Sequence, residues 1–173
     1  FKKAPETEKI IKSLKNNNDI YLVPAFTGLG APHWNANSRG VLSGITRDTG
    51  PKEIIRATIE AVAYQTYDLF EAMKHDGLRP KIVKVDGGMV MNNWFSQFLS
   101  DVVNVKVLRP KVQETTAAGA AFMAGLKIGV YKSLKDISKN WHLDRKFSPK
   151  MKNNFRNNLI KGWSTAIKRT LIN

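Results

Sequence analysis

Residues 81–110 read KIVKVDGGMVMNNWFSQFLSDVVNVKVLRP and carry the strongest structural signal in the chain. The β-branched residues at 81–85 predict a strand, which runs into the glycine turn at 86–88. Aromatic and aliphatic residues recur at helical spacing over about 92–103, so a helix is expected there. A second short strand is predicted over 105–108, because this run is apolar and is followed closely by a proline. A strand, a turn, a helix and a strand in this order indicate an α/β fold.

Upstream of this unit the sequence predicts a short helix, a short strand and a long loop. The helix is expected over 5–17 and the strand over 20–23, where four apolar residues precede a proline. Residues 25–40 contain glycines, a proline and a tryptophan without periodicity, which predicts a long ordered loop. Trp34 and His33 are interpreted as side chains that pack within this loop.

The longest helix is predicted between this loop and the strand at 81–85. Asp48 or Thr49 is the expected cap, and Gly77 is the expected end. Glu60 falls on this helix and is interpreted as a member of an ion pair rather than as a catalytic acid. The residues expected on the buried face of the helix are Ile55, Ile59, Val62, Leu69 and Met73.

Two more helices are predicted downstream of residue 110. The run of small residues over 115–126 suggests a buried helix, since small side chains let neighbouring elements approach closely. A last amphipathic helix is expected to start at Ser148-Pro149. Because no repeat or low-complexity linker interrupts the sequence, the whole is interpreted as one α/β domain. The apolar stripe of the last helix comprises Met151, Phe155, Leu159, Trp163, Ile167 and Leu171.

The 173 residues contain 28 lysines and arginines against 14 acidic residues, which gives a net charge of +14. The lysines are dispersed from Lys2 to Lys168, so a solvated surface is expected rather than one that binds nucleic acid. A basic module that binds nucleic acid is the alternative from a different functional class. No apolar run approaches the roughly 20 residues of a membrane span, so a cytoplasmic protein without membrane association is expected. The absence of cysteine excludes disulfides, and the three histidines lie too far apart in sequence for a metal site.

The glycine turn offers a candidate site for a nucleotide or a phosphate. Glycine permits a positive φ and leaves no side chain between the main chain and a ligand, which makes Gly88 a candidate binding residue. The helix that follows would direct N–H groups and a partial positive charge toward an anion. Asn92 is placed to cap that helix or to hydrogen-bond a nucleotide. A plain tight turn without a ligand is the open alternative, and Asp86 is interpreted as a structural residue of the turn.

Several motifs, taken in order, resemble those of the FGGY family of carbohydrate kinases. Residues 21–34, YLVPAFTGLGAPHW, are similar to the segment that characterises the glycerol kinases of this family. Residues 40–60 match the second family signature at every specified position. The likeness extends from about residue 20 to residue 149. It also includes, in the family's order, AYQT at 63–66, VDGG at 85–88, RP at 109–110 and ETTA at 114–117.

The resemblance implies an actin-like (ribonuclease H-like) ATPase fold, with residues 1–173 as the nucleotide-binding C-terminal domain, a mixed sheet flanked by helices. It also implies that Gly88 contacts the nucleotide through its backbone and that Asn92 supplies a polar contact. The domain is expected to be incomplete, because the family's partner domain and some strands of its sheet lie upstream. The catalytic aspartate belongs to an upstream motif that these residues lack. The resemblance therefore implies no catalytic residue in this chain, which begins at Phe1, and no activity of the chain alone.

The implied reaction transfers a phosphoryl group from ATP to glycerol, with Mg²⁺, and yields sn-glycerol 3-phosphate and ADP. ATP and Mg²⁺ would be held mainly with the upstream domain, in an enzyme expected to form homo-oligomers. Within the family, the open alternative is a kinase that phosphorylates a pentulose or a related polyol. A chain retained only for subunit assembly is a further alternative.

Overall fold

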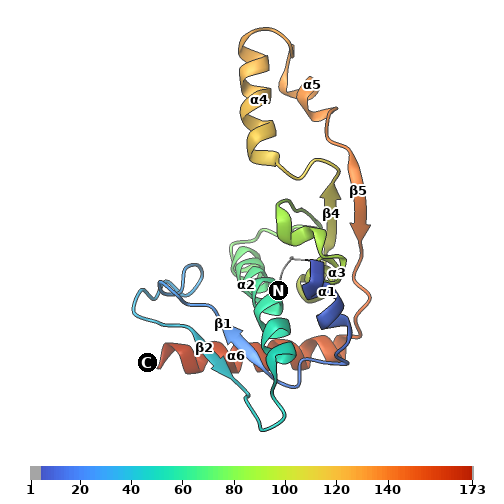
Figure 1. The fold of residues 1–173 in the computed structure, drawn as a ribbon. Coiled ribbons are helices and arrows are strands. Elements are labelled where there is room, and N and C mark those ends of the chain that lie inside the picture. The colour runs from blue at the N-terminus through green and yellow to red at the C-terminus, as the bar shows by residue number, and fades with distance from the viewer. Residues whose placement is uncertain (1–4, 173) are drawn as a thin grey trace.

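A computed structural model describes residues 5–172, in which a body of packed helices carries a projecting arm (Figure 1). Residues 1–4 and 173, which include Lys2 and both ends of the expected 1–173 domain, lie outside the described residues. The helices are α1 (Pro5–Lys12), α2 (Pro51–His75), α3 (Asn93–Val103), α4 (Thr115–Lys127), α5 (Leu134–Ser138) and α6 (Asn153–Leu171), with a short 3₁₀ helix, η1 (Gly88–Met91). The strands are β1 (Tyr21–Val23), β2 (Val41–Ser43), β3 (Ile82–Lys84), β4 (Lys106–Pro110) and β5 (Leu143–Phe147).

The expected strand–turn–helix–strand unit is confirmed. Strands β3 and β4 are parallel, with Val83 opposite Val107, and α3 connects them. Strand β5 pairs with the other side of β4 in the antiparallel sense, which gives the order β3-β4-β5. A separate pair, β1 and β2, is antiparallel and has Leu22 opposite Leu42. The fold is thus mixed α/β, as predicted, although β2 and β5 were not expected from the sequence.

The loop between β1 and β2 is ordered, as expected. Backbone N–H groups of His33 and Trp34 donate to the carbonyl oxygen of Gly30, each at 2.9 Å. His33 packs against α2, since its Nε2 lies 3.3 Å from Oδ2 of Asp68, which also accepts a hydrogen bond from Nε1 of Trp163 at 2.8 Å. The expectation for Trp34 is wrong. Its side chain is 79% exposed, because the tight turn that ends there, with a φ of 47°, projects the ring into solvent.

Helix α2 begins later than predicted. Its N-cap is Gly50 rather than Asp48 or Thr49, and the backbone N–H of Gly50 donates to Oε2 of Glu53 at 3.0 Å. Thr49 closes the preceding turn instead, because its Oγ1 accepts a hydrogen bond from the backbone N–H of Thr46 at 2.8 Å. The hydroxyl that would have capped the helix is therefore already engaged.

The buried face of α2 also differs from the predicted one. Leu69 is 44% exposed, and the other four residues of the expected face are only half-buried. The helix instead buries Arg56 and Glu60, whose Nε and Oε1 atoms lie 2.7 Å apart, so the ion-pair interpretation of Glu60 is confirmed. Helices α1 and α3 pack against this face, so tertiary contacts rather than local hydrophobicity select it. The helix ends two residues before Gly77, as predicted.

An aromatic cluster centred on Tyr64 joins α2 to its neighbours. The ring of Tyr64 stacks on Trp163 of α6, with centroids 5.3 Å apart. Phe98 of α3 meets the same ring edge-on at 5.6 Å, and Tyr21 of β1 lies at 5.7 Å. Trp163 is buried, as predicted for the core face of the last helix. The cluster therefore holds β1, α2, α3 and α6 around one centre.

Helix α6 begins at Asn153, later than the predicted start at Ser148-Pro149. Oδ1 of Asp101, on α3, accepts hydrogen bonds from the backbone N–H groups of Lys150 and Met151 at 2.7 and 3.2 Å. Because Asp101 fixes this segment against α3, the helix starts only after it. Of the predicted apolar stripe, the structure buries Leu159, Trp163 and Ile167 but leaves Phe155 and Leu171 exposed.

Helix α4 is exposed, although its small residues suggested a buried helix. Gly125 is the only buried residue of α4 in the part of the chain that the structure describes. Figure 1 shows the reason, because α4 and α5 lie on the arm beyond the end of β4, away from the packed helices. The small residues of α4 are therefore mostly exposed, although Gly125 permits a close approach of Tyr131.

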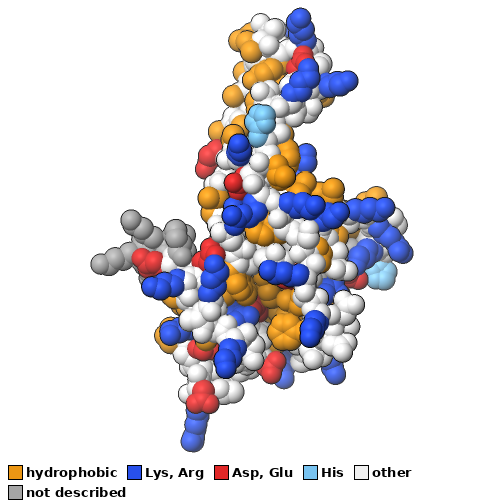
Figure 2. Space-filling view, turned by 90° about the vertical axis from the view of Figure 1, so that its right-hand side faces the viewer, with side chains coloured by type: hydrophobic (Ala, Val, Ile, Leu, Met, Phe, Trp, Pro, Cys, Tyr) orange, Lys and Arg blue, Asp and Glu red, His pale blue; other side chains and the backbone are white. Residues whose placement is uncertain are grey.

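Basic side chains are distributed over the face of the molecule that Figure 2 shows. On the face shown in Figure 2, lysine and arginine side chains are spread from the arm to the body and are interleaved with polar and hydrophobic ones. Such a distribution is typical of a solvated surface. Among residues 5–172, no helix has both the length and the apolar character needed to cross a membrane.

Replacing Gly162 by alanine is expected to destabilise the chain by about 1–3 kcal/mol, because overpacking a filled core has this cost. Gly162 lies on α6, and a Cβ atom there would overlap the phenol of Tyr21, which is buried and packed against Tyr64. Urea denaturation followed by far-UV circular dichroism measures the free energy of unfolding.

Gly119→Ala is the matched control for this experiment. A Cβ on Gly119 of α4 meets no atom within 4 Å. Since alanine has the higher helix propensity, the control is expected to be neutral or stabilising by up to about 1 kcal/mol. Equal losses of stability in the two variants would contradict the tight contact between α6 and β1.

Candidate functional site

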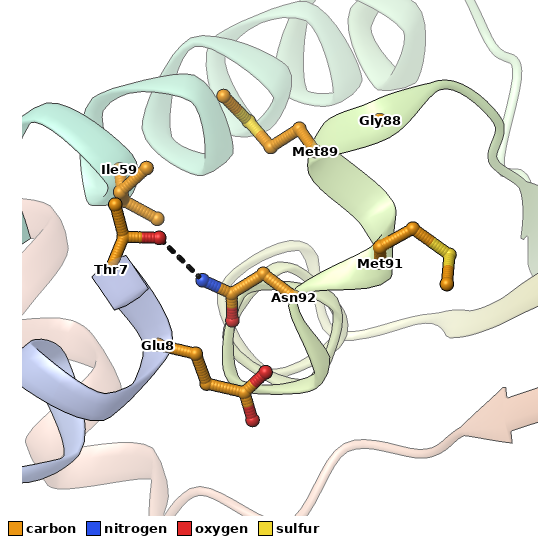
Figure 3. Close-up of a pocket in the computed structure, with 7 residues that line it drawn as sticks. All are labelled: Thr7, Glu8, Ile59, Gly88, Met89, Met91 and Asn92. Atoms are coloured by element: carbon orange, nitrogen blue, oxygen red, sulfur yellow. Dashed lines mark hydrogen bonds between the residues drawn. The ribbon is translucent and has the colours of Figure 1, made fainter. Parts of the chain in front are cut away.

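A pocket of about 500 Å³ lies at the turn after β3, where the sequence places the candidate site. It opens between α1, α2, η1 and the start of α3 (Figure 3). The structure brings Gly88 and Asn92, the two predicted binding residues, to the same pocket. The full lining consists of Thr7, Glu8, Ile59, Gly88, Met89, Met91 and Asn92.

The two glycines of the turn have different roles. Gly87 has a φ of 84°, and its backbone N–H donates to the carbonyl oxygen of Gln113 at 3.3 Å, so this position favours glycine for its conformation. Gly88 has no such φ, and a Cβ placed on it would meet no atom within 4 Å. The main chain at Gly88 therefore faces open space, and no side chain covers it. Asp86 accepts a hydrogen bond from the hydroxyl of Thr115, in agreement with the structural role inferred for it.

Asn92 caps α3, and its side-chain amide is held on both sides. Its Oδ1 accepts a hydrogen bond from the backbone N–H of Phe95 at 3.0 Å. Its Nδ2 lies 3.4 Å from Oγ1 of Thr7, on α1, as Figure 3 shows. These contacts direct the oxygen toward α3 and the nitrogen toward the pocket and α1. A carboxamide nitrogen has a second hydrogen, so Asn92 can still donate to a ligand.

Glu8 occupies the N-terminus of α3 from the neighbouring helix. Its Oε2 accepts a hydrogen bond from the backbone N–H of Asn93 at 3.1 Å, and its Oε1 lies 2.5 Å from Nζ of Lys12. Burial raises the pKa of Glu8, but hydrogen bonds from Lys12, Asn93 and Trp94 outweigh it, and the pKa lies below its usual value. The N–H groups that were expected to attract a phosphate are thus paired with a carboxylate of the protein. The sequence did not identify Glu8, because its spacing from Lys12 resembles an ordinary surface pair on a helix.

Arg109 of β4 holds the main chain of η1 through hydrogen bonds. The side chain is only 6% exposed. Its Nη1 donates to the carbonyl oxygens of Val90 and Met91, at 2.7 and 3.4 Å, and its Nε lies 2.7 Å from Oδ2 of Asp144. Ser96 donates to the same oxygen of Val90 at 2.8 Å. In the sequence, Arg109 stands out only as part of an Arg-Pro motif, because its contact with Val90 of η1 joins residues that are 19 positions apart.

The pocket combines apolar walls with few polar edges. Ile59, Met89 and Met91 supply the apolar surface. The polar groups come from Thr7, Glu8, the amide of Asn92 and the main chain of Gly88. This lining suits a flat, largely apolar ring that carries polar atoms at its edge. Within residues 5–172, no three His, Asp or Glu side chains are grouped so that they could hold a metal ion.

Known proteins resemble this chain in sequence and in structure. Residues 3–128 match the C-terminal domain of the FGGY family of carbohydrate kinases. Glycerol kinase 1 of Pseudomonas aeruginosa is 52% identical over 166 residues, which make up 96% of this chain and 34% of that protein.

Solved structures agree with the sequence comparison. The crystal structure of Plasmodium falciparum glycerol kinase with ADP matches with a TM-score of 0.86 at 34% identity, over 100% of this chain and 35% of that one. The ligand-bound xylulose kinase of Lactobacillus acidophilus matches with a TM-score of 0.74 at 22% identity, over 94% of this chain and 33% of that one. The mixed α/β arrangement is thus that of the C-terminal domain of these kinases, in the actin-like ATPase fold. This chain spans about a third of the length of the relatives it matches. It belongs to the FGGY family of carbohydrate kinases.

Proposed function

We propose that this chain forms the adenosine-binding wall of a glycerol kinase, which transfers the terminal phosphoryl group of ATP to glycerol. The observation that carries the proposal is a pocket in which the bare main chain of Gly88 and the amide of Asn92 face the same space. A solved relative was crystallised with ADP, which supports a nucleotide as the ligand. Glycerol is preferred to a pentulose, because the chain is 52% identical to a glycerol kinase over 166 residues.

The pocket chemistry favours the base and sugar of the nucleotide over its phosphates. A phosphate at the start of α3 would meet the carboxylate of Glu8, which already accepts the N–H of Asn93. Two negative groups at one helix terminus repel each other, so the dipole of α3 is not free for a second anion. The methionines Met89 and Met91 instead offer polarizable surface to a purine ring. The phosphates would then extend out of the pocket.

Residues 1–173 would constitute the C-terminal domain of this kinase, which is its nucleotide-binding half, without the N-terminal partner domain and some upstream strands of the sheet. The catalytic base, the phosphate clamps and the glycerol contacts would come from sequence outside these residues, so the chain alone would bind adenine nucleotide without turning over glycerol. Mg²⁺ would act there together with ATP. Assembly into homo-oligomers and a cytoplasmic location are further parts of this proposal.

Gly88→Val is expected to raise the KM for ATP of the intact kinase at least tenfold, or to abolish ADP binding. The branched side chain would project into the space proposed for the nucleotide, while the fold has room for it, because a Cβ at Gly88 meets no protein atom within 4 Å. Isothermal titration with ADP and steady-state kinetics measure the effect, and thermal denaturation confirms that the variant is folded. An unchanged dissociation constant for ADP would refute the assignment of the site.

Gly119→Val is the matched control for Gly88→Val. It introduces the same side chain where a Cβ also meets no atom within 4 Å, but on α4 and outside the pocket. Its KM for ATP is expected to equal that of the parent kinase. A similar rise in both variants would indicate a general loss of structure instead of a blocked site.

Arg109→Leu is expected to loosen η1 and to speed amide exchange of Asn92 about tenfold or more. Hydrogen bonds from a charged donor contribute about 1.5–3 kcal/mol, and the substitution leaves the carbonyl oxygens of Val90 and Met91 without this donor. The amide of Asn92 reports on the turn because it donates to the carbonyl oxygen of Met89 at 3.1 Å. Hydrogen exchange read by NMR or mass spectrometry measures the change.

Asp144→Asn is the control, since it removes only the partly exposed partner of Arg109 and leaves the contacts with η1 in place. Because asparagine keeps an oxygen that can accept the hydrogen bond from Nε of Arg109, its effect on exchange is expected to be smaller than that of Arg109→Leu, within about 1 kcal/mol. If Asp144→Asn loosened the turn as much as Arg109→Leu, the ion pair rather than the carbonyl contacts would hold η1.

A further inference from the structure

We propose that Glu8 is a positioning residue of the nucleotide site, which holds α1 in place as one wall of the pocket and thereby presets Asn92. This inference rests on the proposed function, because it concerns the same pocket. It assigns a role to α1, a helix that contains neither the glycine turn nor any of the motifs that resemble those of the family.

Helix α1 contributes two neighbouring residues to the pocket, and both contact the start of α3. Thr7 lies against the amide nitrogen of Asn92 at 3.4 Å, and Glu8 accepts the backbone N–H of Asn93 at 3.1 Å. Each contact joins residues that are 85 positions apart in the sequence. The pocket is therefore closed on this side only as long as α1 stays docked on α3.

The two ends of α1 are held by different means. Its C-terminal end is fixed by Ile11, which is fully buried, and by the carbonyl oxygen of Leu14 just beyond the helix, which accepts Nη1 of Arg56 at 2.9 Å. The end that lines the pocket has the polar contacts of Thr7 and Glu8 with α3. Glu8 is the charged member of this pair, and its side chain is only 18% exposed. Hydrogen bonds to a charged acceptor are stronger than neutral ones, so Glu8 is the main tether.

Loss of this tether would act on nucleotide affinity through preorganisation. Without Glu8, the first turn of α1 samples other positions, and the nucleotide has to order it again on binding. In the view of Figure 3 the amide of Asn92 points toward Thr7, and the carboxylate of Glu8 lies beyond Asn92, away from Gly88. Because the base and sugar contact the pocket, the loss of Glu8 would weaken the binding of adenosine as much as that of ADP. The rate of the chemical step would not change.

The test uses the intact kinase that contains this chain and compares Glu8→Ala, Glu8→Asp and Glu8→Gln. Glu8→Ala is expected to raise the dissociation constants for ADP and for adenosine by the same factor, about five- to tenfold, as for loss of a helix cap. Glu8→Asp keeps the charge but is shorter by one methylene, so it should give a similar rise. Glu8→Gln keeps an acceptor of the right length and should restore most of the affinity. The KM for ATP should follow these changes, while kcat at saturating ATP stays within twofold of the parent.

Lys12→Gln is the matched control, because it removes the other partner of Glu8, a side chain that is 58% exposed, and leaves the contact with Asn93 intact. Its nucleotide affinity should not change. Thermal denaturation of every variant separates loss of folding from loss of affinity, and Glu8→Asp decides the question if Glu8→Ala does not fold.

Two outcomes would overturn the inference. Folded Glu8→Ala and Glu8→Asp variants that bind ADP within twofold of the parent would show that Glu8 is a stabilising residue only. A rise for ADP but not for adenosine would show that Glu8 acts on the phosphates. Both results would leave the proposed function standing as long as Gly88→Val still weakens ADP binding. If Gly88→Val binds ADP as the parent does, the proposed function fails independently of Glu8.

Discussion

The buried ion pair between Arg56 and Glu60 is the contact on which the surroundings of the pocket depend. Arg56 also reaches the carbonyl oxygen of Leu14 at 2.9 Å and lies 5.0 Å from the ring centroid of Trp94. Glu60 accepts a hydrogen bond from Tyr64 at 3.2 Å, at the centre of the aromatic cluster. Burial raises the pKa of Glu60, and Arg56 opposes that rise. Removing one partner of such a pair costs about 3–5 kcal/mol, because the other charge stays buried alone. Through this pair α2 fixes both the exit of α1 and the first turn of α3, between which the pocket opens.

The polar groups around the pocket mostly bind the protein itself. Asn92 caps α3, Glu8 accepts an N–H of the same helix, and Arg109 holds the carbonyl oxygen of Val90. What remains for a ligand is the bare main chain at Gly88, one amide hydrogen and an apolar wall. Binding energy at such a site comes mainly from burial of a ring, and the few polar groups set its orientation. A rigid scaffold behind the wall limits the entropy that a ligand loses when it binds.

Sequence reasoning succeeded where local pattern and tertiary structure agree. The strand–turn–helix–strand unit and the cap at Asn92 follow from short-range spacing, and the structure contains both. It failed where contacts between residues far apart in the sequence determine the structure. Strand β5 is charged and exposed over most of its length, as an edge strand can be, so it has no apolar alternation to find. The inner face of α2 depends on α1 and α3, and the role of Glu8 on a helix 85 residues away. The small residues of α4 were misleading, because a lack of bulk permits close packing without requiring it.

The contact between Gly162 and Tyr21 links two positions that are far apart in the chain. The phenol of Tyr21 fills the room that any side chain at position 162 would need. A substitution at one position therefore requires a compensating substitution at the other. A bulkier residue on α6 needs a smaller one on β1 to avoid a clash, and a smaller residue on β1 leaves a cavity unless a bulkier one on α6 fills it. Through generations of related proteins the pair should change in concert or not at all. Tyr21, the first residue of the YLVPAF segment, thus limits the size of the side chain that α6 can have at position 162.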